Sequence, residues 1–156
     1  MAQELALHEK EGEFSGRLVP EDVDDFVFFC RSVSAVDNLI YCVDEAGLVI
    51  NPHQKERAVY ALATLGGHWK QDGIWITQQP TTVPTVLRSQ VDEIYFFRMD
   101  EKNDLEWASN YLGEHVDQLP TLGVRENAEC FIYRRGEIEI ERIRLTPATL
   151  KAMIPL

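Results

Sequence analysis

The stretch that decides the fold is Leu39-Ile40-Tyr41-Cys42-Val43-Asp44-Glu45, in which an apolar run is followed at once by two carboxylates. A run that is apolar on both faces is typical of a central strand in a parallel sheet. The carboxyl end of such a strand is where α/β sheets bind ligands. Asp44 and Glu45 are therefore the first candidates for functional residues.

Helices and strands alternate along the rest of the chain. Apolar residues recur at helical spacing or in short runs, which predicts helices over 21–36, 52–66, 85–90 and 103–112, and strands over 14–19, 38–43, 73–77 and 93–98. The last part predicts a β-hairpin, with strands over 129–134 and 137–145. We therefore predict an α/β fold, a mostly parallel sheet with helices on both faces and a C-terminal β-hairpin. Residues 1–13 are expected to form a flexible or helical segment, and residues 14–156 a single domain.

Composition and charge exclude several classes of protein. The chain has 156 residues, with 15 Lys or Arg and 26 Asp or Glu, so its net charge is −11. This charge repels phosphate polyanions, so DNA contact is expected only within a larger assembly. No apolar run approaches the roughly 20 residues of a membrane helix, and no signal-peptide pattern opens the chain. Three widely spaced cysteines indicate reduced thiols and a cytoplasmic protein.

Asp44 and Glu45 match the Walker B pattern, an apolar strand that ends in Asp-Glu. In this pattern the Asp associates with Mg²⁺ and the Glu polarises an attacking water. A second polar cluster, Thr77-Gln78-Gln79, follows the next predicted strand. An amide at that place can sense a γ-phosphate or orient water beside the acidic pair. Each pattern taken alone also occurs as ordinary polar residues at the end of a strand.

Taken together, these motifs resemble the HerA/FtsK superfamily of P-loop ATPases, which pump and package DNA. The resemblance covers about residues 14–145 and is most specific in ITQQPTTVPTVLRSQVDEIYFFR, residues 76–98. It implies that Asp44 binds the metal and the ATP cofactor, that Glu45 is the catalytic base, and that Gln78 is the sensor. It also favours a phage or prophage source.

The sequence departs from this family in two respects. It contains no Gly-Lys dipeptide and therefore no Walker A loop, whose backbone amides and Lys hold the triphosphate. Family members often carry Arg where this chain has Gly67 and Gln79. Arg88 and Arg98 are the nearest remaining candidates for arginine chemistry, and Arg88 is placed with the catalytic residues.

Two functions stay open. The chain is either a truncated or degenerate relative of a DNA-translocating ATPase, or a non-catalytic protein-binding or regulatory module on the same fold. In the first case it is not an independent ATPase, and ATP and Mg²⁺ bind only if a partner or a substitute element holds the phosphates. We expect the strand at 73–77 to pair with that at 93–98, or else a homo-oligomer or partner chain that supplies the missing strand.

The hairpin carries the one local group of basic residues, Arg134, Arg135, Arg142 and Arg144. They either face DNA or a neighbouring subunit in an assembly, or pair with nearby glutamates across the hairpin. We favour pairing, because Glu137, Glu139 and Glu141 alternate along the second strand.

Overall fold

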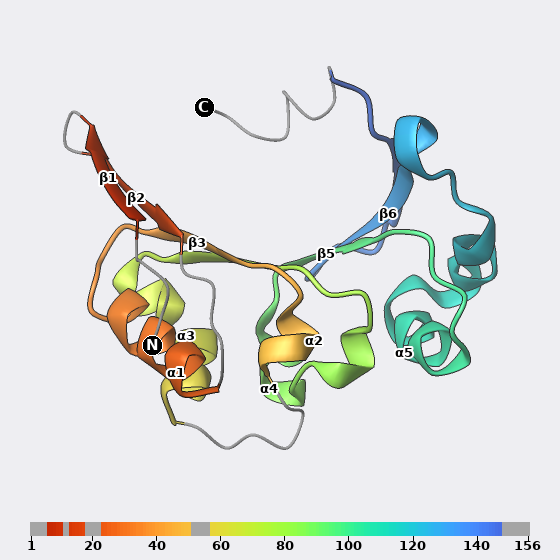
Figure 1. The fold of residues 1–156 in the computed structure, drawn as a ribbon. Coiled ribbons are helices and arrows are strands. Elements are labelled where there is room, and N and C mark those ends of the chain that lie inside the picture. Colours follow the sequence, from red (N-terminus) through yellow and green to blue (C-terminus); the bar gives the residue numbers. More distant parts are fainter. Residues whose placement is uncertain (1–5, 11–12, 18–22, 51–56, 148–156) are drawn as a thin grey trace. The chain divides into compact units, whose positions relative to one another are not determined.

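The computed structural model describes residues 6–10, 13–17, 23–50 and 57–147 (Figure 1). The chain divides into two compact units, residues 1–90 and 91–156. Each unit has its own cluster of buried apolar side chains. The single domain that the sequence predicts over residues 14–156 stays a prediction. Two units form because each cluster buries its apolar residues among elements of its own part of the chain.

The first unit contains strands and helices in alternation. Its strands are β1 (Ala6–Lys10), β2 (Glu13–Arg17), β3 (Ile40–Val43) and β4 (Asp72–Trp75). Its helices are α1 (Val23–Val33), α2 (Ala46–Val49), α3 (Arg57–Leu65) and α4 (Thr85–Gln90), with the 3-10 turns η1 (Gly66–Trp69) and η2 (Pro80–Thr82). β1 and β2 pair antiparallel, whereas β3 and β4 pair parallel. β1 lies where a flexible or helical segment was expected, because pairing with β2 satisfies its backbone groups.

One face of the β3–β4 sheet carries the core of the first unit. Tyr41, Val43 and Trp75 pack with apolar side chains of α1, α3 and α4, helices that lie on one side of these strands (Figure 1). Successive side chains of a strand point to opposite faces. Those of the other face, Ile40, Ile74 and Ile76, are 71%, 53% and 48% exposed. Helices were expected on both faces of the sheet. Among the described residues they cover only one.

Gln71 joins the start of β4 to the end of α1. Its side chain is buried, and its Nε2 donates hydrogen bonds to the carbonyls of Val33 (2.7 Å) and Val36 (2.5 Å). The last carbonyls of a helix have no partner within the helix. The Gln71 amide thus caps α1 and holds it against the sheet.

The second unit is an antiparallel sheet with helices on one side. Strands β5 (Glu93–Phe96), β6 (Glu129–Arg134) and β7 (Glu141–Arg144) lie in the order β5-β6-β7. α5 (Lys102–Leu112), η3 (Gly113–Thr121) and η4 (Arg125–Asn127) connect β5 to β6. Phe96 and Phe131 of the sheet are buried against Ala108, Leu112 and Leu119.

These pairings confirm the predicted C-terminal hairpin and correct the rest of the sheet. A mostly parallel sheet was expected, but parallel pairing is confined to β3 and β4 in the described part of the chain. β5 pairs with β6 on one edge, and its pairing with β4, a strand of the other unit, stays a prediction. β6 suits this central position, since its residues Cys130, Phe131 and Ile132 are buried.

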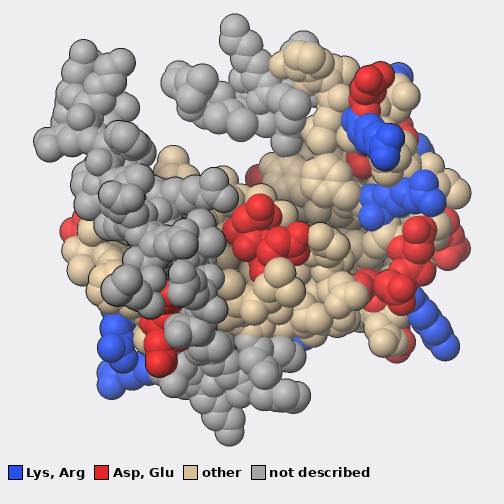
Figure 2. Space-filling view, in the orientation of Figure 1, with Lys and Arg blue, Asp and Glu red and all other residues tan. Residues whose placement is uncertain are grey.

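The hairpin arginines pair with carboxylates, as the sequence favoured. Arg134 lies within 4 Å of three glutamates, Glu93 (3.1 Å), Glu137 (3.9 Å) and Glu141 (2.9 Å). Arg142 donates a hydrogen bond to Glu129 at 3.0 Å. Figure 2 shows basic and acidic side chains close together over the region of β6. These pairs balance most of the positive charge of the hairpin.

No helix within the described ranges is long and apolar enough to span a bilayer.

Replacing Gln71 with Ala should lower the free energy of unfolding by about 1–3 kcal/mol, because it removes the two hydrogen bonds that this buried side chain donates. Urea denaturation followed by circular dichroism measures this loss. Gln90→Ala, at an exposed position at the end of α4, is the matched control and should change stability by less than about 0.5 kcal/mol. Equal losses in the two variants would contradict the capping role.

Burial of Cys30 makes the stability of the first unit sensitive to alkaline pH. Burial raises the pKa of the Cys30 thiol from 9.0 to about 12. The folded state therefore keeps a proton that the unfolded state loses above pH 9, so stability is full below pH 9 and falls as the pH rises towards 12. Cys30→Ala should make the fall in Tm above pH 9 shallower. An unchanged slope would contradict this assignment.

Candidate functional site

The candidate site lies where β3 and β4 end. The two strands run parallel with Val43 opposite Trp75. Backbone hydrogen bonds continue past the last paired residues, because Ile76 N–H donates to the Val43 carbonyl (2.9 Å) and Ala46 N–H donates to the Ile76 carbonyl (2.7 Å). The residues that follow each strand are thereby held side by side.

Glu45 and Gln78 meet at this point. Gln78 Nε2 donates a hydrogen bond to Glu45 Oε1 at 2.5 Å. The backbone of Glu45 is left-handed, with φ 50° and ψ 47°, a conformation that costs a non-glycine residue about 1–2 kcal/mol. Strain of this kind concentrates at functional sites. The contact joins two residues that lie 33 positions apart in the sequence.

Asp44 lies beside this pair and is open to solvent. Its Oδ1 accepts a hydrogen bond from the Glu45 backbone N–H at 2.9 Å. Asp44 and Gln78 are exposed and Glu45 is half-buried. Burial and the neighbouring Asp44 carboxylate raise the pKa of the Cys42 thiol, so this cysteine stays protonated at neutral pH and is not an activated nucleophile.

A polar turn forms the other side of the site. Gln79 N–H donates to Thr77 Oγ1 (3.2 Å), and Thr82 Oγ1 donates to the Gln79 carbonyl (2.6 Å). A Cβ atom at Gly47 would overlap Thr82 Oγ1 and lie 3.2 Å from Thr77 Oγ1. Glycine at position 47 thus allows α2 to lie directly against this turn. Sequence reasoning missed Gly47 and Thr82, although a glycine two residues after Asp-Glu was the available signal.

The two candidate arginines lie on other elements. Arg88 is half-buried on α4, and its Nη2 donates to Thr85 Oγ1 at 3.2 Å. Arg98 belongs to the second unit and lies 3.8 Å from Asp100. The structure therefore brings together Asp44, Glu45 and Gln78, whereas the catalytic role of Arg88 stays a prediction.

The residues of this corner fit a magnesium ion that arrives with a nucleotide. In the described residues no group of three His, Cys, Asp or Glu side chains is placed to hold a metal. Mg²⁺ is usually bound by one or two carboxylates together with waters and substrate phosphates. Asp44 is such a carboxylate, with Glu45 next to it. Two neighbouring carboxylates would supply only part of the coordination of such an ion.

No family model matches the sequence, and no curated protein is significantly similar to it. Solved structures do match. The genome packaging NTPase B204 from Sulfolobus turreted icosahedral virus 2, in complex with ATPγS, matches with a TM-score of 0.63 and 23% identity, over 78% of this chain and 64% of that chain. The DNA-packaging ATPase B204 from Sulfolobus turreted icosahedral virus matches with a TM-score of 0.63 and 21% identity, over 79% of this chain and 62% of that chain. Over most of its length, this chain shares the fold of a part of B204.

The match to B204 confirms the expected likeness to a DNA-packaging NTPase at the level of the fold. A third B204 structure, from Sulfolobus turreted icosahedral virus 2 in complex with AMPPCP, gives a TM-score of 0.61 over 77% of this chain and 58% of that chain. The chain thus spans slightly less than two thirds of the length of these B204 structures.

Gly47→Ala tests the close approach of α2 to the polar turn. The added methyl group should destabilise the protein by about 1–3 kcal/mol through overpacking against Thr82. Combining it with Thr82→Ala should recover part of this loss, because the hydroxyl that it meets is gone. Chemical denaturation of both single variants and the double variant gives the coupling energy. Strictly additive losses would contradict the contact.

Proposed function

We propose that this chain provides the acidic Walker B corner and the sensor glutamine of a nucleotide site of the genome-packaging type. The observation that carries the proposal is the hydrogen bond from Gln78 to Glu45, made where two parallel strands end. It places an amide and two carboxylates at the edge where α/β sheets bind ligands. The likeness of the fold to B204 also supports the proposal of a nucleotide site.

Each residue of the corner has a role that suits its chemistry. Asp44, the exposed carboxylate, would hold Mg²⁺, which would neutralise phosphate charge. Glu45, held by the Gln78 amide, would polarise the attacking water, and Gln78 would link its position to the state of the phosphates. Arg88 is our candidate for the cation that stabilises charge on those phosphates.

A further segment must hold the triphosphate, because the chain has no Walker A loop. The bare face of β3 and β4 supports this part of the proposal. Parallel sheets are normally covered on both faces, yet Ile40, Ile74 and Ile76 are exposed here and no described strand pairs with the second edge of β4. We propose that a second copy or a partner chain covers this face, and that DNA is engaged only by the resulting assembly.

The proposal predicts weak binding of Mg²⁺–ATP to the isolated chain. NMR titration should shift the Gln78 side-chain amide and the Ala46 backbone amide, with a dissociation constant in the millimolar range, because most of the usual phosphate contacts are missing. No ATP turnover is expected. Asp44→Asn should abolish the shifts, since it removes the carboxylate that would hold the metal.

Asp72→Asn is the matched control for this titration. It removes the same charge from an exposed residue of the same sheet, at the start of β4 rather than beyond its end, and should leave the shifts intact. If both variants lose the shifts equally, the shifts depend on the net charge of the protein and not on Asp44, and the proposal is overturned. A titration without shifts at Gln78 would also overturn it and would favour the non-catalytic binding module.

A further inference from the structure

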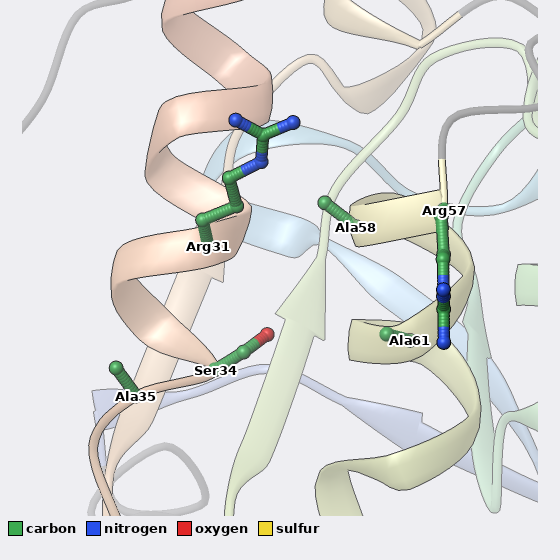
Figure 3. A pocket seen from close by; sticks show the side chains of 6 residues that line it. All are labelled: Arg31, Ser34, Ala35, Arg57, Ala58 and Ala61. Atoms are coloured by element: carbon green, nitrogen blue, oxygen red, sulfur yellow. The ribbon is translucent and has the colours of Figure 1, made fainter.

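An open concavity lies in the first unit, between α1 and α3 (Figure 3). It is open and has a volume of about 350 Å³. Two arginines and four small residues line it, namely Arg31, Ser34, Ala35, Arg57, Ala58 and Ala61. None of these residues belongs to the corner at Asp44 and Glu45.

The two arginines of this pocket differ from those of the hairpin. Arg134 and Arg142 form ion pairs with glutamates, whereas neither Arg31 nor Arg57 has an ion pair with any described residue, and no carboxylate is among the described residues that line the pocket. Like charges repel each other, and an anion bound between them offsets this repulsion. The chain as a whole has a net charge of −11, so this pocket is a locally positive region. Its positive charge favours an anionic ligand.

The small residues leave room for that ligand. Ser34, Ala58 and Ala61 point into the space between the helices, and Arg31 and Arg57 come from opposite sides of it (Figure 3). The Ser34 hydroxyl donates its hydrogen to the Cys30 carbonyl at 2.7 Å, so its oxygen can accept a hydrogen bond from a ligand. A guanidinium group binds phosphate in a bidentate manner through its planar fork of N–H donors.

The dimensions favour a small ligand over a macromolecule. A volume of about 350 Å³ falls at the lower end of the range of about 300–1,000 Å³ for small-molecule sites. Two cations are too few for a DNA backbone, which tight binders contact at about 6–10 phosphates.

We infer that the pocket between α1 and α3 binds the phosphate group of a small phosphorylated molecule, with Arg31 and Arg57 holding it from two sides. This site is independent of the proposed nucleotide corner, and it requires no metal.

Titration of the full chain with inorganic phosphate and with pyrophosphate, in the absence of Mg²⁺, tests the inference. NMR should show saturable shifts of the Ser34 and Ala58 amides. Arg31→Gln and Arg57→Gln should each weaken binding about tenfold, since each removes a charged hydrogen-bond donor. Arg125→Gln, at an exposed arginine of the second unit, is the control of equal charge and should leave binding unchanged.

Ala61→Leu tests whether binding depends on the shape of the pocket or only on the positive charge at the surface. It keeps both arginines and fills the space between the helices, so it should weaken binding, while circular dichroism confirms that the variant folds. Parallel titrations with ribose 5-phosphate and AMP show whether a sugar phosphate or a nucleotide fits better, and stronger binding of either supports the inference. Absence of saturable binding, equal weakening by Arg125→Gln, or preference for a polyglutamate peptide over phosphate would overturn it.

Discussion

The parallel alignment of β3 and β4 is the constraint on which the candidate site depends. Parallel strands place their carboxyl ends at one edge of a sheet, and the bond from Ala46 N–H to the Ile76 carbonyl extends this alignment into the loops. Glu45 adopts a left-handed backbone there, and Gly47 allows α2 to lie against Thr82. Rigid strands thus hold exposed polar groups at fixed positions, which loops alone could not do.

The two faces of this small sheet are in different environments. Tyr41 and Val43 are buried against α1 and α3, and Gln71 fastens α1 to the sheet. Ile40 and Ile74 of the other face contact solvent. Burial of apolar area contributes about 25 cal/mol per Å², so covering this face would stabilise the unit considerably. The exposed face thus supports the proposal that a further polypeptide segment covers this sheet and holds the phosphates.

Charge is distributed unevenly over this acidic chain. In the second unit, Arg134 is enclosed by three glutamates, and such exposed pairs stabilise a protein only slightly. In the first unit, Arg31 and Arg57 line a pocket that has no acidic side chain among its described residues. The hairpin arginine thus forms ion pairs within its own sheet. Arg31 and Arg57, between α1 and α3, are the residues that we propose bind a ligand.

The sequence by itself determined most of the elements but not β1 and α2, because apolar periodicity and turn residues act locally. The run from Leu39 to Val43 predicted β3, Arg135-Gly136 predicted the hairpin, and Asp44 with Gln78 predicted the place of the site. Only the tertiary structure decided that β5 pairs with β6, that Ile40 of β3 is exposed, and that Arg31 and Arg57 line one pocket. Strand partners and helix contacts depend on residues far apart in the chain, and a local pattern of hydrophobicity carries no information about which of several compatible partners will pair.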